Sequence, residues 1–296
     1  MTYESVEQAL EKLCKLEKTH AAYVHALGVI ELDAAAAAPK GSWEGRGVTT
    51  GVLSEVMYDL IADPQNGELI AYLKEQELDD LNRRKVEVLE KNYQRMNRIP
   101  AEEYVAYNML LNDAQAAWEK AKNAADFSVF QPYLEQIVEY NRKFAGYYDP
   151  GLPAYDALLN EYEEGMTMEI LDVFFEKLRS TIVPLLEKIQ KKNDPVPGFV
   201  CRHYPADIQR RFSDLLMETM GLDRNYCGIA ESEHPFTINY NNKDVRITTH
   251  YFEDNLLPSM FSVIHEGGHA LYELGGDPKY DYTALYGGAS MGIHES

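Results

Sequence analysis

The sequence predicts a mainly α-helical protein with a small β-hairpin or sheet beside one motif-bearing helix. Apolar residues recur at intervals of three and four along most of the 296-residue chain, as in amphipathic helices. After Gly221 the pattern changes to β-branched and aromatic residues that flank a short polar turn. We therefore expect a helical region over residues 1–200, joined in one continuous domain to a region over residues 201–296 that contains the hairpin.

Successive helices separated by Pro- and Gly-rich breaks are predicted for the first region. Residues 38–47 are expected to form a loop, and residues 63–67 are expected to end the second helix. Thr167 is placed to be the N-cap of the last helix, and Pro184 is expected to kink that helix. The predicted helices span residues 2–33, 48–62, 78–98, 101–127, 126–148 and 168–192.

The second region begins after residues 193–199, NDPVPGF, which form the best candidate linker. A helix is predicted from near Pro205 to Met220. The hairpin is predicted from TINY at residues 237–240 and DVRITTHYF at residues 244–252, with a polar turn between them. It directly precedes a further predicted helix, so a strand is expected beside that helix.

Composition limits the classes of function. The formal net charge of −20 argues against a nucleic-acid partner, because a phosphate backbone would be repelled. We also expect no membrane partner, since no apolar run approaches the roughly 20 residues of a membrane span, and no secretion signal is recognisable. The three widely spaced cysteines, Cys14, Cys201 and Cys227, predict buried thiols in a reducing, cytoplasmic compartment.

Residues 261–275, FSVIHEGGHALYELG, contain the most distinctive motif in the chain. His265 and His269 are four residues apart, so on a helix they lie about 40° apart on one face and can reach one metal ion. Glu266 is rotated away from the two imidazoles and is better placed to contact a water molecule on that ion. Two imidazoles that hold a metal and a carboxylate that accepts a proton are the groups that a zinc hydrolase needs.

Two glycines interrupt this helix. Gly267 and Gly268 each cost about 1 kcal/mol of helix stability relative to alanine, so some other interaction must compensate. Our hypothesis is that the missing side chains let a substrate backbone or a neighbouring strand approach the metal. The alternative is close packing against another helix.

A third protein ligand is required, because a catalytic zinc ion keeps three protein ligands and one open position. Glu273 is about two helical turns from His265, too far along the helix axis to complete a tetrahedron. Spacing alone leaves the choice open among the other acidic or imidazole residues downstream, which are Asp277, Asp281, His294 and Glu295.

Four motifs in order resemble the carboxypeptidase Taq family of metallopeptidases. They are HEGGHALYE followed by HES, His234-Pro235-Phe236, the D-x-R-x-T element from Asp244 to Thr248, and residues 155–167. The resemblance implies that His265, His269 and Glu295 hold one zinc ion per chain, or alternatively cobalt or manganese. It also implies that Glu266 is the general base, that residues 201–296 are a partial catalytic region, and that the protein is a cytoplasmic homodimer.

The chain departs from the family pattern in length. Family members are substantially longer, and their arginine-bearing motif, which helps recognise the substrate C-terminus, has no counterpart in these 296 residues. We therefore expect a fragment or a truncated product whose activity is in question. Glu295 is expected at a frayed end, where ordering a residue costs about 1–2 kcal/mol, so metal binding should be weaker than in a longer relative.

The function implied by the resemblance is a metallocarboxypeptidase that removes C-terminal residues from peptides with broad specificity. Two alternatives remain: an oligopeptidase that uses the same metal site, and a helical interaction module that retains the motif without catalysis. His234 is a candidate substrate contact, although a structural histidine is about as plausible. Arg246 is a second candidate for a substrate carboxylate, but a structural pair with Asp244 is favoured.

Overall fold

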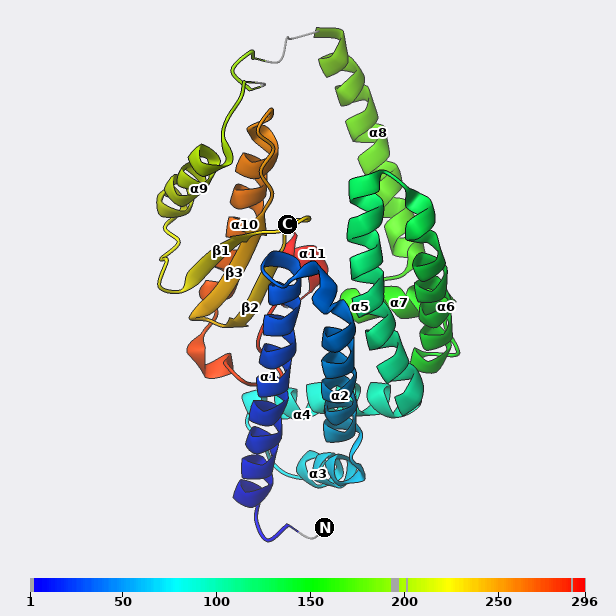
Figure 1. The fold of residues 1–296 in the computed structure, drawn as a ribbon. Helices are drawn as coiled ribbons and strands as arrows, with labels where there is room; N and C mark the ends of the chain where they lie inside the picture. Colours follow the sequence, from blue (N-terminus) through cyan, green and yellow to red (C-terminus); the bar gives the residue numbers. More distant parts are fainter. Residues whose placement is uncertain (1–2, 193–196, 201, 289, 296) are drawn as a thin grey trace.

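Helices dominate the computed structural model, which describes residues 3–192, 197–200, 202–288 and 290–295 (Figure 1). The prediction of a mainly helical fold with a small sheet is confirmed. The helices are α1 (Val6–Ala36), α2 (Trp43–Ala62), α3 (Pro64–Lys74), α4 (Asp80–Arg98), α5 (Ala101–Ala124), α6 (Gln131–Tyr148), α7 (Ala154–Tyr162), α8 (Met168–Lys192), α9 (Ala206–Met220), α10 (Leu257–Leu274) and α11 (Met291–His294). The strands are β1 (Cys227–Glu231), β2 (Thr237–Asn241) and β3 (Asp244–Thr249).

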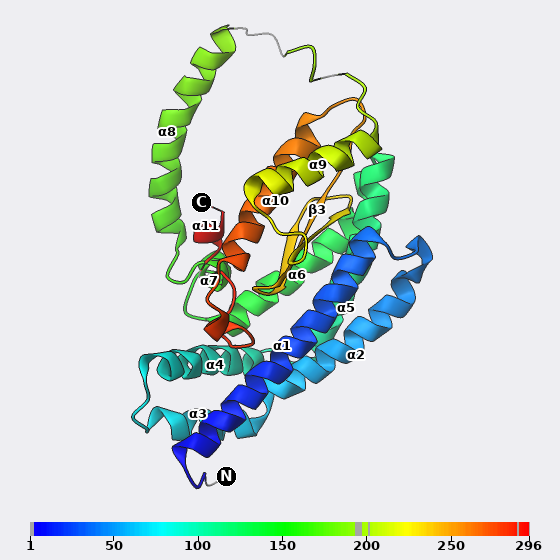
Figure 2. The ribbon, with the colours of Figure 1, turned by 90° about the vertical axis from the view of Figure 1, so that its left-hand side faces the viewer.

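The first seven helices form the helical body of the molecule. α1 packs against α2, α2 against α5, α5 against α6 and α6 against α7, while α3 and α4 close one end (Figures 1 and 2). A cluster of buried side chains joins α1, α3 and α4 at that end; it includes Leu13, Leu69, Leu73, Val86 and Leu89.

One prediction for this body was wrong and one helix was missed, because proline and glycine were taken only as helix breakers; α2 does end at Ala62, as predicted. The predicted loop over residues 38–47 contains a short 3-10 turn at Lys40–Ser42 and the start of α2 at Trp43. The segment expected to end α2 also begins α3. Asp63 caps α3 by accepting a hydrogen bond from the Gln65 N–H, and Pro64 occupies the first turn, where no amide hydrogen is needed.

Other helix boundaries follow the predictions more closely. Thr167 caps α8 as predicted, since its hydroxyl accepts a hydrogen bond from the Ile170 N–H at 3.3 Å. The helix expected to begin at Asp126 begins at Gln131 instead, after a 3-10 turn at Phe127–Val129. Within the predicted linker, residues 193–196 lie outside the described part of the chain.

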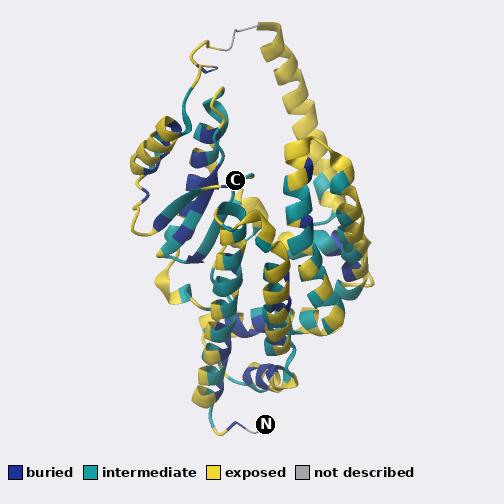
Figure 3. Cartoon of the chain, viewed as in Figure 1, coloured by how far each residue is buried: buried dark blue, intermediate teal, exposed yellow. Residues whose placement is uncertain are grey.

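Helix α8 stands apart from the helical body (Figures 1 and 2). None of its residues is buried, and nearly all of them are exposed (Figure 3). Large apolar side chains nevertheless recur along it, including Val173, Phe174, Leu185, Leu186 and Ile189. In the described ranges, neither this helix nor any other is long and apolar enough to cross a membrane.

The predicted hairpin is confirmed, and a third strand extends it. β2 and β3 are antiparallel, and β1 pairs in parallel with the other side of β3, which gives the order β1-β3-β2. β1 was not predicted, because β2 separates it in the chain from its pairing partner β3 and its sequence, CGIAE, has no strong alternation.

The sheet lies between α10 and α9 on one face and α1 on the other. On the first face, buried side chains include Met217, Cys227, Val245, Ile247, Val263 and Ala270. On the other face, Tyr240 of β2 approaches α1 so closely that a Cβ atom on Gly28 would lie 2.8 Å from its ring. Because side chains alternate along a strand, Thr237 and Asn239 of β2 face α10.

Two of the three cysteines can be assessed. Cys227 is buried, as predicted, and Cys14 is only half-buried; both carry free thiols. Cys201 lies outside the described residues.

Candidate metal centre

The motif segment is helical, as predicted, within α10. One helical turn separates His265 from His269, so the two imidazoles lie on one face. Their Nε2 atoms are 3.2 Å apart. His265 is 58% exposed, whereas the side chain of His269 is 12% exposed. The two nitrogens therefore converge on one point at the protein surface.

Glu295 completes a group of three ligand atoms. It follows α11 directly, and its carboxylate oxygens lie 3.7 Å from Nε2 of His265 and 3.6 Å from Nε2 of His269. The three ligand atoms all lie within 4.8 Å of one another. In a tetrahedron with zinc–ligand distances of about 2.0–2.1 Å, ligand atoms are about 3.3 Å apart. The separations fit one small divalent ion, which these three side chains would hold beside the cavity described below.

The other residues that spacing had left open have different partners. Asp277 pairs with Lys279 at 2.8 Å, and a carboxylate oxygen of Asp281 accepts a hydrogen bond from the Asn242 N–H at 3.3 Å. Glu273 and His294 contact each other at 2.7 Å.

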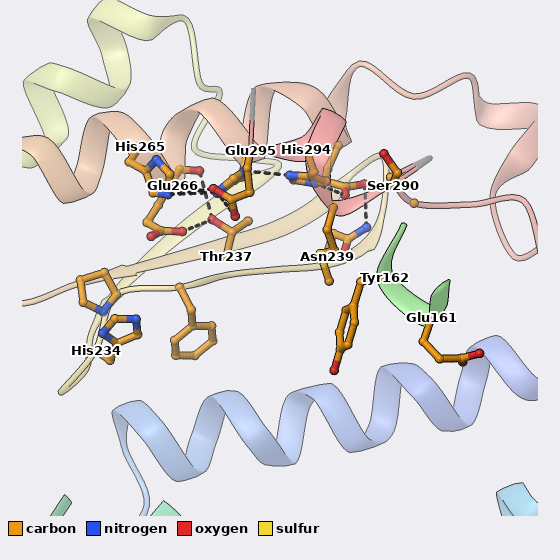
Figure 4. A pocket seen from close by; sticks show the side chains of 17 residues that line it. Glu161, Tyr162, His234, Thr237, Asn239, His265, Glu266, Ser290, His294 and Glu295 are labelled. Atoms are coloured by element: carbon orange, nitrogen blue, oxygen red, sulfur yellow. Dashed lines mark hydrogen bonds and ion pairs between the residues drawn. The ribbon is translucent and has the colours of Figure 1, made fainter. Parts of the chain in front are cut away.

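Glu266 is buried beside the three candidate ligands, with 6% of its surface exposed. Its Oε2 accepts a hydrogen bond of 2.7 Å from the Thr237 hydroxyl of β2 (Figure 4). The strand thus fixes one carboxylate oxygen, which leaves the other to contact a water molecule or a substrate in the cavity.

A second glutamate of α10 belongs to a chain of contacts behind His269. Nδ1 of His269 lies 2.8 Å from Nδ1 of His294, and Nε2 of His294 lies 2.7 Å from Oε1 of Glu273. Asn239 of β2 donates a hydrogen bond of 2.7 Å to the other oxygen of Glu273. This series of contacts therefore connects His269 to β2 through the interior of the protein.

Contacts from distant parts of the sequence hold the segment that presents Glu295. Ser290 caps α11 through Ile293, and Glu163, after α7, accepts a hydrogen bond of 2.9 Å from the Gly292 N–H. Farther upstream, the Ala284 N–H donates a hydrogen bond of 3.1 Å to Glu17 of α1. Glu17 also forms an ion pair of 2.7 Å with Lys85 of α4.

The two motif glycines differ in their surroundings. A Cβ atom on Gly267 would lie 2.7 Å from Cε of Met220 and 3.2 Å from Cδ1 of Leu222, at the end of α9. At Gly268 a Cβ atom would meet no described atom within 4 Å. The hypothesis that Gly267 admits substrate or a strand was wrong, since the close-packing alternative accounts for it.

A cavity of about 630 Å³ opens beside the candidate ligands. His234 lies toward one end of it, and Glu161 and Tyr162 lie toward the other (Figure 4). The lining includes four glutamates, whereas lysine and arginine do not occur among the described residues that line it. A bound cation would offset this negative charge. The lining residues are Glu161, Tyr162, His234, Pro235, Phe236, Thr237, Asn239, His265, Glu266, His269, Glu273, Gly287, Gly288, Ser290, Met291, His294 and Glu295.

The two candidate substrate contacts occupy different places. His234 lines the cavity, and its ring makes an edge contact with Trp118 of α5 at a centroid distance of 6.4 Å. Arg246 forms two hydrogen bonds of 2.9 Å with Asp244 and lies over the Tyr240 ring, on the sheet face toward α1. The favoured alternative, a structural pair, accounts for Arg246.

Sequence reasoning missed Thr237 and Asn239, and it gave Glu273 no role once it was too distant for the metal. A signal was present in the alternation of TINY, where polar Thr237 and Asn239 share one strand face. A polar face directed at a helix that carries two glutamates indicates hydrogen bonding between the two elements.

A mainly helical fold in which a small sheet supports a His-Glu-x-x-His helix is the architecture of a helical metallopeptidase. A family model described as Carboxypeptidase Taq (M32) metallopeptidase matches residues 12–296. The chain therefore belongs to this family.

Relatives and solved structures agree with this membership. The chain is 37% identical to Carboxypeptidase 1 of Bacillus subtilis over 93% of its length, and 32% identical to Thermostable carboxypeptidase 1 of Pyrococcus furiosus over 99%. The BsuCP crystal structure superposes on 97% of the chain with a TM-score of 0.93 and 35% identity. The M32 carboxypeptidase from Deinococcus radiodurans superposes on 97% of it with a TM-score of 0.86 and 28% identity.

The chain spans little more than half the length of these proteins. It covers 55% of the Bacillus subtilis relative and 59% of the Pyrococcus furiosus relative. Each of the two solved structures is covered to 58%.

Proposed function

We propose that this chain is the metal-binding part of a metallocarboxypeptidase in which His265, His269 and Glu295 hold one zinc ion and Glu266 is the general base. The proposal rests chiefly on the three ligand atoms, which approach one another within 4.8 Å although they come from two separate helical segments. Family membership, and the names of the relatives, support the reaction class.

When bound at this position, a divalent ion supplies positive charge that acidifies water and polarises a substrate carbonyl. Glu266 accepts the proton from the attacking water and delivers it to the leaving amine. Thr237 holds one oxygen of Glu266, so the carboxylate stays oriented through both transfers.

Zinc is the metal that the donor set favours. Two imidazoles and one carboxylate, with one position open, form a common set of ligands for catalytic zinc. Cobalt and manganese are the alternatives. Metal content, measured after purification without added metal, distinguishes among the three.

We propose that peptide substrates bind along β2. This strand is at an edge of the sheet, and its Thr237 and Asn239 line the cavity. An edge strand presents unpaired main-chain groups that an extended peptide can bind. His234, at one end of the cavity, would then contact the substrate on one side of the scissile bond.

An oligopeptidase is the second candidate. The lack of lysine and arginine among the described cavity-lining residues favours it, because a substrate C-terminal carboxylate has no strong cationic partner there. A carboxypeptidase would need such a cation from residues other than those that line this cavity, and the relatives are longer than this chain.

We propose three further properties together with this function. The protein is a homodimer, to be tested by light scattering after size-exclusion chromatography. It acts in the cytoplasm, for which the free thiols of Cys14 and Cys227 are the supporting observation. Residues 1–200 and 201–296 belong to one continuous peptidase domain, to be tested by whether heat unfolds them in one transition.

The decisive experiment measures hydrolysis together with metal stoichiometry, for this chain and for a longer relative. Release of the C-terminal amino acid from an N-blocked dipeptide is expected to require metal and a free substrate carboxylate. Cleavage of the C-terminal amide at the same rate would favour the oligopeptidase. If the chain binds no metal and cleaves neither substrate, the helical interaction module becomes the better account.

A further inference from the structure

We infer that His294 is a positioning residue that keeps His269 in the tautomer able to bind metal. The inference rests on the proposed metal site and goes one step beyond it. His294 immediately precedes Glu295, so one short segment would supply a ligand and also orient a ligand on another helix.

The contacts permit one consistent assignment of protons. For Nε2 of His269 to bind a metal, its lone pair must be free, so its Nδ1 must carry the hydrogen. That hydrogen is donated to Nδ1 of His294, which lies 2.8 Å away and must therefore be an acceptor. Nε2 of His294 then carries its own hydrogen and donates it to Glu273 at 2.7 Å.

Glu273, at the end of this series of hydrogen bonds, fixes the direction in which each hydrogen is donated. A carboxylate can only accept hydrogen bonds, so Glu273 requires a donor at each oxygen. The Asn239 amide donates to one oxygen at 2.7 Å, and His294 donates to the other. If His294 carried its hydrogen on Nδ1 instead, its Nε2 and Glu273 would be two acceptors facing each other in a buried place.

Burial makes the assignment consequential. Side-chain exposure is 7% for Glu273, 19% for His294 and 12% for His269, so water has little access to replace a lost contact. His265, the other imidazole ligand, is 58% exposed. The protein therefore orients one imidazole from its interior, whereas the other stands in the solvent.

The fold also holds the His294 ring in place. A Cβ atom on Gly288 would lie only 2.6 Å from Cδ2 of His294, so this position leaves no room for a side chain. On α10, the Tyr272 ring lies 4.7 Å from the His294 ring. Both ring nitrogens of His294 already have partners, Nδ1 with His269 at 2.8 Å and Nε2 with Glu273 at 2.7 Å. His294 therefore orients a metal ligand and does not bind the metal itself.

Two variants of His294 test the inference, first by their zinc affinity and then by the tautomer of His269. His294→Phe keeps a ring but removes the acceptor, whereas His294→Asn keeps an acceptor close to the position of Nδ1. Zinc affinity, measured by competition with a chromophoric chelator, is expected to fall about 10–100-fold in His294→Phe. His294→Asn is expected to recover most of it. His25→Phe, which keeps a ring stacked on Tyr240 on the sheet face opposite α10, is the control and should retain the parent affinity.

A second readout needs no metal. Nitrogen-15 NMR of the metal-free chain should show His269 protonated on Nδ1 in the parent and in His294→Asn, and shifted toward the Nε2–H tautomer in His294→Phe. Gly288→Ala, which displaces His294 without changing its chemistry, should act in the same direction as His294→Phe.

Several results would overturn the inference. One is an unchanged zinc affinity or His269 tautomer in a His294→Phe chain whose circular dichroism matches the parent. Another is an equal loss in His294→Phe and His294→Asn, because it would show that the acceptor is irrelevant. The variant His265→Ala distinguishes failure of this inference from failure of the proposed function. If the parent and His265→Ala bind zinc equally weakly, the metal site itself is refuted.

Discussion

The hydroxyl of Thr237 on β2 lies 2.7 Å from the carboxylate of Glu266 on α10, and it also lies 3.1 Å from the Glu266 backbone carbonyl. Two residues along β2, Asn239 contacts Glu273 in the same way at 2.7 Å. One face of a short strand thus orients two carboxylates of the helix, one beside the candidate ligands and one behind them.

Removal of the Thr237 hydroxyl is expected to slow turnover while leaving the metal bound. A hydrogen bond to a charged group contributes about 1.5–3 kcal/mol, so Thr237→Val should lower kcat by roughly tenfold or more. KM should change little. Thr237→Ser, which restores the hydroxyl, should return most of kcat; a Thr237→Val enzyme with the parent kcat would contradict the proposed orientation.

Replacement of Glu266 by glutamine tests the general base. The amide cannot accept the proton, so kcat should fall by about 10²–10⁴-fold, the usual contribution of general acid–base catalysis. Zinc stoichiometry should match the parent, because the three proposed ligands are unchanged. Activity retained in Glu266→Gln would rule out this role for Glu266.

The ion pair between Glu17 and Lys85 should behave as a buried pair. Side-chain exposures of 4% and 10% mean that either residue alone would leave an uncompensated charge in the interior. Lys85→Met is expected to cost about 3–5 kcal/mol of unfolding free energy. Urea denaturation of both single variants and of Glu17→Gln/Lys85→Met should show the double variant losing less than the sum of the single losses. Additive losses would contradict a coupled pair.

The two motif glycines offer a matched pair of substitutions. Gly268→Ala should raise the unfolding free energy by up to about 1 kcal/mol, since alanine favours the helix and its Cβ meets no described atom within 4 Å. Gly267→Ala should gain less or lose stability, because the Met220 thioether and Leu222 would have to move. Thermal unfolding of the two variants compares them directly. A larger gain at Gly267 would contradict the packing described here.

Burial of Cys227 predicts a loss of stability in alkali. Burial raises the pKa of this thiol from 9.0 to about 11, so between these values the folded state holds a proton that the unfolded state has released. The associated stability is therefore complete below pH 9 and declines as the pH rises toward 11. Between pH 8 and pH 10, the urea concentration at the midpoint of unfolding should decrease more in the parent than in Cys227→Ala. Equal declines in the two chains would contradict the prediction.

Local patterns predicted much of the helical fold, the hairpin and the motif helix. These patterns missed a helix where the same residue types can either end one helix or begin the next. Asp63 and Pro64 were expected to end a helix but also begin the next, because an aspartate cap and a first-turn proline suit a helix start. β1 escaped prediction because its partner, β3, follows a separate strand in the chain.

In the candidate site, too, the sequence pattern predicted the position of some residues and not of others. His265, Glu266 and His269 lie on one helix, so periodicity alone placed them together. The approach of Glu295 depends on a loop whose path is set by Glu17 and Glu163, which lie far away in the sequence. Only the resemblance to a family selected Glu295. The contacts of Glu273 with His294 and Asn239 depend on tertiary packing that spacing does not encode.

The hydrogen bond from the Ala284 amide to Glu17 joins residues 267 positions apart. Contacts between such distant segments form late, because the entropy of closing a long loop must be overcome first. During synthesis, the first helix is complete long before the ribosome reaches Ala284, and the two histidines emerge before the glutamate that would join them. Metal capture is therefore expected only after α1 has met the segment that leads to Glu295.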